Sequence, residues 1–180
     1  IAEIKPTIPR YCRVNRVIRD IPGNNVVEGN TRTSLRQDIQ EIMKERGTRC
    51  QCIRCRQGRG DAAGSFTLIR RTYEASGGRE DFLSFEDPST DQLASLLRLR
   101  IPGSERVRGL PVLEGAGLIR ELHSYGDHLA LHRRRAGSDQ HRMQQLLRFV
   151  RGVLRGVGGA VEITAQQAVT LRARVADAPE

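Results

Sequence analysis

Residues 49–60 read RCQCIRCRQGRG, and this cysteine-rich turn separates two parts of the chain that have different hydrophobic patterns. Glycine is a strong breaker of regular structure, so the glycine-rich run from Gly58 to Gly64 predicts a boundary between modules. The length of 180 residues allows one hydrophobic core and a small second module. We therefore expect a small module at residues 1–60 and a larger domain at residues 61–180.

The part before the turn contains one predicted helix. Residues 1–30 alternate short apolar and basic positions around prolines, which exclude a long helix and predict an extended arm. From Thr31 to Arg46 the spacing is that of an amphipathic helix, with Thr33 or Ser34 as N-cap and Gly47 as C-cap. The apolar stripe of this helix, which we interpret as core, consists of Leu35, Ile39, Ile42 and Met43.

Beyond the glycines the hydrophobic period changes to two, which is typical of strands. The predicted strands lie in FTLIRRTYEAS (66–76), EDFLSFED (80–87), LASLLRLRI (93–101) and GLIRELHSYG (117–126). Successive strands joined by short turns predict a largely antiparallel sheet. Helical spacing returns from Gln140 to Arg155, and AVEITA at residues 160–165 predicts a further strand. The predicted fold class of the second part is therefore α+β.

The composition carries a positive charge, with 30 Lys and Arg against 21 Asp and Glu and a formal net charge of +9. Such a balance favours a polyanionic partner such as RNA. Almost all of the basic residues are arginines, since Lys5 and Lys44 are the lysines, and a coding sequence rich in G and C produces that bias without selection for phosphate binding. Charge alone therefore leaves RNA binding and a solvated surface open.

The sequence shows no targeting or membrane signal. No stretch approaches the roughly 20 apolar residues that span a bilayer, and the N-terminal IAEIKPTIPR lacks the apolar region of a signal peptide. We expect a protein without membrane contact, located in the cytoplasm. The chain begins without Met and contains four Phe, three Tyr and no Trp, which predicts a piece of a longer protein.

All of the cysteines lie in the first third of the chain, at Cys12, Cys50, Cys52 and Cys55. Zinc binds four thiolates at about 2.3 Å in closed structural sites, and a C-x-C-x-x-C turn can present three sulfurs while a remote segment supplies the fourth. Neighbouring Arg49, Arg54 and Arg56 would lower the thiol pKa values and offset the charge of the centre. A structural zinc site is the preferred interpretation. The alternatives are reduced structural cysteines, a disulfide and, with less weight, an iron–sulfur cluster.

The same residues carry a family resemblance. YCRVNRVIRDIP (11–22), SLRQDI (34–39) and CQCIRCR (50–56) resemble the segment that follows the radical domain in the catalytic subunit of Elongator, the enzyme of wobble-uridine modification. FLSFEDP (82–88), LLRLRIP (96–102) and GLIRELHSYG (117–126) resemble the start of the acetyltransferase domain of that family. The resemblance covers residues 1 to about 141.

This resemblance implies a reaction on tRNA. In the family a radical S-adenosylmethionine domain with a 4Fe–4S cluster works with a GNAT-like domain that binds acetyl-CoA, and an acetyl-derived carbon is attached to C5 of uridine 34. The implied partners are tRNA and the radical domain. By position, the four cysteines match the family's zinc ligands. The strand whose backbone runs beside acetyl-CoA is matched by Glu121, Leu122, His123 and Ser124, where the family usually has Val at the last position.

Two departures from the family pattern lower the expected activity. Every cysteine is already assigned to zinc, so S-adenosylmethionine and the 4Fe–4S cluster belong to the radical domain, which this sequence lacks. The family's glycine-rich Q-H-x-G-x-G loop, which cradles the CoA pyrophosphate, reads QHRMQQ at residues 140–145. The later tyrosine-rich motif is also missing. We therefore expect a GNAT-like domain that is incomplete or divergent after about residue 141, with weak or lost acetyl-CoA binding.

Other polar residues receive no catalytic assignment. His123 could act as a general base, but a histidine in a half-buried strand is more often simply hydrogen-bonded. A basic stretch with His128, His132, His141 and Arg133–Arg135 is best explained as a solvated loop. Besides the enzyme fragment, two hypotheses stay open. One is a non-enzymatic, zinc-stabilised RNA-binding module, and the other is a degenerate acetyltransferase fold kept for protein contacts.

Overall fold

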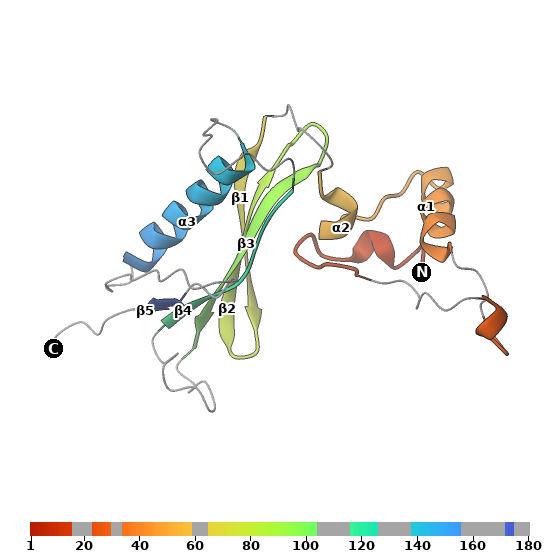
Figure 1. Ribbon diagram of the computed structural model, residues 1–180, viewed down its shortest axis with the longest axis horizontal. Coiled ribbons are helices and arrows are strands. Elements are labelled where there is room, and N and C mark those ends of the chain that lie inside the picture. The colour runs from red at the N-terminus through yellow and green to blue at the C-terminus, as the bar shows by residue number, and fades with distance from the viewer. Residues whose placement is uncertain are drawn as a thin grey trace. The chain divides into compact units, whose positions relative to one another are not determined.

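The computed structural model describes residues 1–15, 23–29, 34–58, 65–103, 116–125, 138–155 and 172–174 (Figure 1). The chain forms two compact units, Ile1–Gln57 and Gly58–Glu180. The first unit is built from short helices and irregular backbone, and the second from an antiparallel sheet with one long helix. This architecture confirms the predicted α+β class and the antiparallel sheet.

The first unit has little regular structure. It contains the 3-10 helices η1 (Lys5–Thr7) and η2 (Gly23–Asn25) and the α-helices α1 (Leu35–Glu45) and α2 (Ile53–Arg56). The prediction of an extended arm is wrong at η1, because Pro6 lies in the first turn of this helix, where a fixed φ near −65° favours helical backbone. Residues 16–22 of the predicted arm lie outside the described part of the chain.

Helix α1 begins and ends close to its predicted limits. Ser34 is the N-cap residue, although its hydroxyl donates to the Asp38 carboxylate (3.4 Å) and accepts no hydrogen bond from a backbone N–H of the helix. Arg46 is the C-cap, one residue before the predicted Gly47, whose φ of +64° is readily adopted by glycine. The N–H groups of Gly47 and Thr48 donate to the carbonyls of Lys44 (3.0 Å) and Met43 (2.8 Å) and close the helix in a Schellman motif.

The core of the first unit is small and includes cysteines. Its buried residues are Ile39, Met43, Cys50 and Cys52. One side of α1 therefore packs against the cysteine turn. Ile42 was predicted to belong to this core but is 38% exposed, so the buried stripe of α1 is narrower than the sequence pattern suggests.

The second unit is a single sheet with strand order β1-β2-β3-β4-β5 and antiparallel pairing throughout. The strands are β1 (Thr67–Ala75), β2 (Gly78–Glu86), β3 (Leu93–Pro102), β4 (Ala116–Ser124) and the short β5 (Arg172–Arg174). The first four coincide with the four predicted strands. The predicted strand at residues 160–165 lies outside the described residues.

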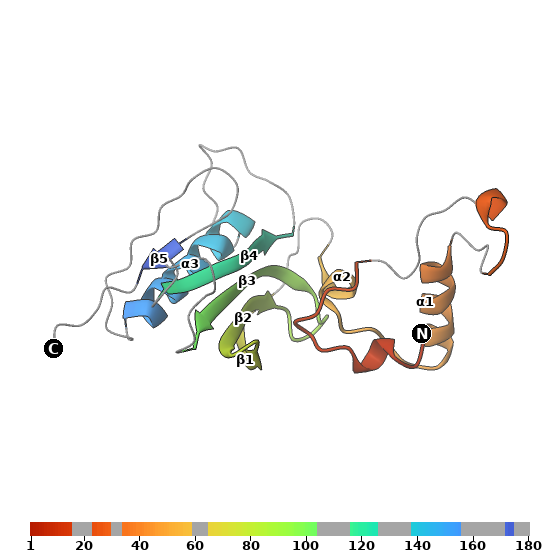
Figure 2. The same cartoon turned by 90° about the horizontal axis from the view of Figure 1, so that it is seen from below.

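Helix α3 (Asp139–Arg155) lies along one face of this sheet (Figure 2), and it begins one residue before its predicted start. Leu146 and Val150 of α3 are fully buried against the sheet. The sheet side of this core consists of Leu83, Phe85, Ala94, Leu97, Leu99 and Ile119. Because successive strand residues point to opposite faces, the alternation of leucines with arginines in β3 assigns the arginines to the face without α3.

Candidate metal centre and cofactor strand

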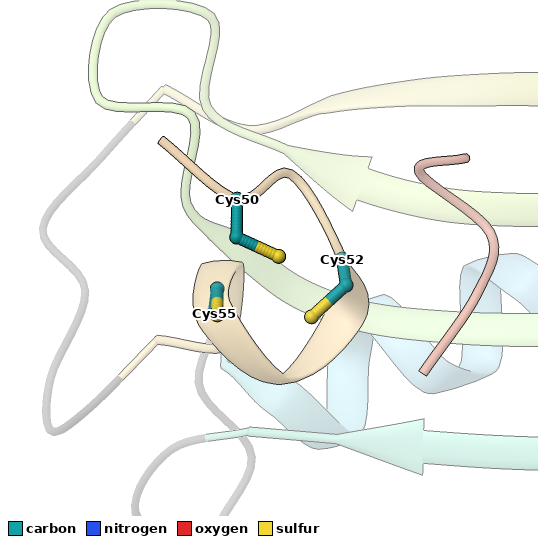
Figure 3. A group of neighbouring side chains, drawn as sticks. All are labelled: Cys50, Cys52 and Cys55. Carbon is teal, nitrogen blue, oxygen red and sulfur yellow. The ribbon is translucent and has the colours of Figure 1, made fainter. Parts of the chain in front are cut away.

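The cysteine turn brings three thiols together (Figure 3). The Sγ atoms of Cys50, Cys52 and Cys55 all lie within 4.8 Å of one another. Cys50 and Cys52 are buried and Cys55 is partly buried, and all are free thiols. Four sulfurs at about 2.3 Å from a tetrahedral zinc ion lie roughly 3.8 Å apart, so the spacing of these three suits a zinc centre. The donor set is soft thiolate, which zinc also favours.

Local backbone geometry explains how a short turn presents three sulfurs. Cys52 is the N-cap of α2 with extended backbone (φ −67°, ψ 159°), and Cys55 lies within the first turn of α2, so the two side chains point to the same side. The N–H of Cys55 donates to the carbonyl of Cys52 (3.1 Å). Cys50 precedes this turn and closes the group, as the C-x-C-x-x-C spacing predicts.

A hydrogen bond between Cys55 and Cys52 moves the pKa values of these two thiols in opposite directions. A hydrogen bond from the Cys55 thiol lowers the pKa of Cys52 below its ordinary 9.0. Burial opposes this shift, and hydrogen bonds from the N–H groups of Val14 and Cys55 add to it. The same bond to Cys52, together with burial, raises the pKa of Cys55. The predicted cause, the neighbouring arginines, is not among the main contributions. A metal ion would displace the thiol protons and bind both sulfurs as thiolates.

Cys12 approaches the turn through its backbone. Its carbonyl accepts the N–H of Ile53 (2.9 Å), and its own N–H donates to Pro9 (2.9 Å). Within the described part of the chain, the close group of metal-ligand atoms consists of three sulfurs, and the Cys12 sulfur is not one of them. The structure therefore brings together three of the four predicted ligands and places the main chain of Cys12, the fourth, beside them. Binding of a metal by the Cys12 sulfur stays a prediction.

Arginines hold the N-terminal arm against the cysteine turn. The buried Arg56 donates to the carbonyls of Gln51 (2.9 Å) and Arg10 (3.2 Å), and Arg54 donates to the carbonyl of Asn15. Arg56 and Arg54 thus bind backbone oxygens, whereas their predicted role was to lower the pKa values of the thiols.

Strand β4 carries the residues that resemble the acetyl-CoA strand. Its partner β5 pairs only with Ala116–Leu118, and on that edge no strand of the described residues pairs with the remainder of β4. The N–H of Tyr125 donates to Ala94 of β3 (2.7 Å), so the alternation of backbone groups directs those of Leu122 and Ser124 to the opposite, open edge. Backbone donors and acceptors on an open edge can bind an extended ligand. The assignment of acetyl-CoA to Glu121, Leu122, His123 and Ser124 stays a prediction.

His123 is held by its neighbours. Its Nε2 lies 3.3 Å from Oε1 of Glu121, its ring stacks on Tyr125 with centroids 6.2 Å apart, and about half of the side chain is exposed. Glu121 is itself bound by Arg98 at 2.6 Å. These contacts favour a hydrogen-bonded surface histidine over a general base.

The QHRMQQ segment is helical. The N–H groups of His141 and Arg142 have partners inside the chain, namely the hydroxyl (3.3 Å) and carbonyl (3.0 Å) of Ser138. The Arg142 guanidinium lies over the Phe66 ring at 4.2 Å, and the Gln145 amide contacts His141 (3.2 Å). Side chains therefore occupy the helix start at the position where the family resemblance predicts a glycine-rich loop.

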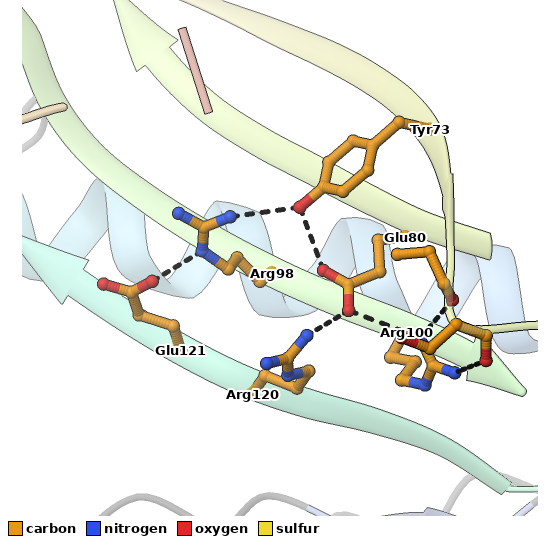
Figure 4. A network of polar contacts seen from close by, with 8 residues as sticks. Tyr73, Glu80, Arg98, Arg100, Arg120 and Glu121 are labelled. Atoms are coloured by element: carbon orange, nitrogen blue, oxygen red, sulfur yellow. Dashed lines mark hydrogen bonds and ion pairs between the residues drawn. The ribbon is translucent and has the colours of Figure 1, made fainter. Parts of the chain in front are cut away.

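A polar network covers the face of the sheet opposite α3 (Figure 4). Glu80 of β2 is only 2% exposed and accepts a hydrogen bond from the Tyr73 hydroxyl (2.9 Å). It also pairs with Arg120 and lies 3.5 Å from Arg100. Although burial raises the pKa of Glu80, hydrogen bonds from Tyr73 and Arg120 outweigh it and hold that pKa below 4.5. Because these charges are paired, the network is best explained as structural.

This network was not predicted from the sequence, which contains only a partial signal for it. Arg98 and Arg100 alternate with leucines on β3, which indicates one polar face of the sheet but not the pairing of its charges. Within the described residues, no helix is both long and apolar enough to cross a membrane.

Comparisons with known proteins agree with the resemblance. A protein of Dehalococcoides mccartyi named tRNA uridine(34) acetyltransferase is 47% identical over 148 residues, which are 79% of this chain and 32% of the relative. Elongator complex protein 3 of Dictyostelium discoideum is 39% identical over 148 residues, covering 78% of this chain and 26% of the relative. No family profile matches the chain.

A solved structure gives the same result. The archaeal Methanocaldococcus infernus Elp3 with an N-terminal deletion superposes with a TM-score of 0.66 at 29% identity, over 95% of this chain and 46% of that one. This chain spans a third or less of the length of the two curated relatives. Over most of its length the chain is therefore related to part of the tRNA uridine(34) acetyltransferase and Elongator complex protein 3 family, which confirms the predicted resemblance.

Proposed function

We propose that this chain is the zinc-bearing linker and the beginning of the acetyl-CoA-binding, GNAT-like domain of an enzyme that modifies uridine 34 of tRNA. The observation that carries the proposal is the 47% identity to a tRNA uridine(34) acetyltransferase over 148 residues. In the proposed enzyme an acetyl-derived carbon becomes attached to C5 of the uridine. The radical chemistry for that step would come from a domain with S-adenosylmethionine and a 4Fe–4S cluster that is not part of this sequence.

Each unit has its own role in this proposal. Cys50, Cys52 and Cys55 would hold a structural zinc ion, with Cys12 as the fourth ligand, because the three clustered sulfurs have the right chemistry and spacing. The open edge of β4 would bind acetyl-CoA within residues 121–124, through the main-chain groups of Leu122 and Ser124. The QHRMQQ segment gives no glycine loop for the pyrophosphate, so we expect acetyl-CoA to bind more weakly than about 1 µM.

Calorimetric titration of the zinc-loaded chain with acetyl-CoA tests the second role. Ser124→Pro removes one N–H from the open edge without removing a bond to β3, and we expect it to abolish the binding heat. His123→Ala removes a side chain from the same strand, and the binding heat should persist. Equal binding by wild type and Ser124→Pro would contradict the main-chain contact.

A second set of variants tests the phosphate end. Replacing Met143 and Gln145 together by glycine recreates the family spacing, and we expect it to tighten acetyl-CoA binding. Gln144→Gly is the matched control, because it introduces a glycine at an intervening position and should not tighten binding. If no variant binds acetyl-CoA at all, the acetyltransferase assignment fails and the domain is a degenerate fold kept for other contacts.

The alternative is a zinc-stabilised RNA-binding module without catalysis, and the net charge of +9 favours it. Under this alternative, tRNA affinity falls linearly with salt on logarithmic axes and does not respond to acetyl-CoA. The enzyme hypothesis requires coupling between the two ligands. Measurement of tRNA affinity at several salt concentrations, with and without acetyl-CoA, distinguishes the two, and absence of tRNA binding at low salt would exclude the alternative.

A further inference from the structure

The first unit buries a lysine ammonium group to which the described residues offer no hydrogen-bond partner. Lys5 is 2% exposed, and its Nζ atom is enclosed without an acceptor. Burying an unpaired charge is costly, so such a group is normally matched by an anion. The lysine ammonium can donate three hydrogen bonds and accepts none.

The residues around Lys5 tie it to the cysteine turn. Lys5 lies in η1, where its N–H donates to the carbonyl of Ile1 (3.0 Å), and the carbonyl of the next residue, Pro6, accepts the side-chain amide of Gln51 (3.3 Å). Gln51 stands between Cys50 and Cys52, so this bond ties η1, and with it the buried Lys5, to the segment that carries the sulfurs.

Two arginines of the cysteine turn donate hydrogen bonds to backbone carbonyls. Arg54 donates to the carbonyl of Asn15, and Arg56 donates to those of Gln51 and Arg10. A zinc ion with three or four thiolates carries a net charge of −1 or −2, in a core that also contains Ile39 and Met43. Such an anion is stabilised by N–H donors that bond its sulfurs.

We propose that Lys5 is the charge-compensating residue of the metal centre, and that its buried ammonium donates hydrogen bonds to the cysteine thiolates when the metal is bound. The inference rests on the proposed zinc site. Lys5 acts through the ligands and is a positioning residue, not a ligand itself. It accounts for a buried cation in the arm whose role the sequence pattern does not reveal.

The test is metal affinity, measured by competition of the full chain with a chromophoric chelator for zinc and for cobalt(II). Lys5→Met retains the length of the side chain and removes its charge, and we expect it to weaken metal binding by about 10- to 100-fold. Lys5→Arg keeps the charge and should retain most of the affinity. Lys44→Met is the matched control, because Lys44 is exposed on α1, and its affinity should equal that of the wild type.

The cobalt spectrum gives a second readout that a packing defect would not change in the same way. Hydrogen bonds to thiolates lower their donor strength, so the sulfur-to-cobalt charge-transfer bands of Lys5→Met should shift to lower energy, while those of Lys44→Met stay in place. The chelator competition still compares the metal-bound forms of the variants if the metal-free first unit is unfolded in each of them, because the unfolded chain is then a common reference state.

The outcomes separate the two proposals. If the wild-type chain binds neither zinc nor cobalt, the metal centre itself is wrong. If the wild type binds and Lys5→Met binds equally well with an unshifted spectrum, the role of Lys5 is wrong. Equal losses in Lys5→Met and Lys5→Arg would also overturn it, because a fit of shape and not a charge would then be required at this position.

Discussion

The buried carboxylate of Glu80 offers the most direct test of the sheet network. Glu80→Gln keeps the volume of the side chain and removes its charge, leaving the Tyr73 hydroxyl with an acceptor and the arginines without an anion. The carboxylate has three such partners, one of which, Arg100, also donates to the carbonyls of Ala75 (2.8 Å) and Ser76 (2.7 Å). The substitution should therefore destabilise the second unit without disrupting its strand pairing.

The size of the effect follows from these contacts. A hydrogen bond to a charged group contributes about 1.5–3 kcal/mol. Arg120 is 50% exposed, so its pair with Glu80 contributes only about 0–1 kcal/mol after screening. Arg100 keeps its backbone partners in the variant. We expect Glu80→Gln to lower the free energy of unfolding of the second unit by about 2 kcal/mol at neutral pH.

The direction of the Glu80 pKa shift determines how this loss of stability depends on pH. The pKa of Glu80 is lowered in the folded state, so its contribution is complete above the unfolded value of 4.5 and disappears as the pH falls through the folded value. The difference between wild type and Glu80→Gln should thus be full at pH 7 and vanish in strong acid. Urea unfolding followed by far-ultraviolet circular dichroism measures it, with the exposed Glu74→Gln on the same hairpin as control. A loss that is equal at both pH values, or equal in the control, would refute the argument.

Two further perturbations address the first unit. Removing the metal with a chelator should unfold residues 34–58, because two of the four buried core residues, Cys50 and Cys52, are proposed ligands. Hydrogen exchange should then show loss of protection in α1 but not in β2 and β3. Continued protection of α1 would contradict a structural metal. Gly47→Ala should lower the free energy of unfolding by about 1 kcal/mol through backbone strain alone, because φ is +64° and no atom lies within 4 Å of an added Cβ. Thermal unfolding of the zinc-loaded chain measures this loss. An unchanged midpoint would show that the Schellman motif does not limit stability.

The sheet was predictable because its signals are local. Period-two alternation in β1 to β4, ended by turn residues, defined each strand to within a few residues, and the two-residue turn at Ser76 and Gly77 has positive φ at both positions, as tight hairpins require. Helix α3 was equally clear from its apolar spacing. Pairing of neighbouring strands then followed from their order in the chain.

The first unit was less predictable because long-range contacts determine it. The cysteine spacing indicated three clustered sulfurs, and the structure brings those three together. It did not indicate that Lys5, in a polar arm, would be buried, or that Ile42 in an apolar stripe would stay exposed. Both outcomes depend on which side of α1 the arm covers, and neither periodicity nor composition contains that information.

The attachment of the arm has a consequence for the order of assembly. Cys50, Cys52 and Cys55 lie within six residues of one another, whereas Arg56 and the Arg10 carbonyl that it binds are 46 residues apart. Closing a loop of that length costs more conformational entropy than forming the short turn. We therefore expect the turn to capture its metal ion first as an open, exchangeable three-sulfur site. Docking of the arm would follow as a slower step that locks the ion in place, so the rate of metal release would report on the arm.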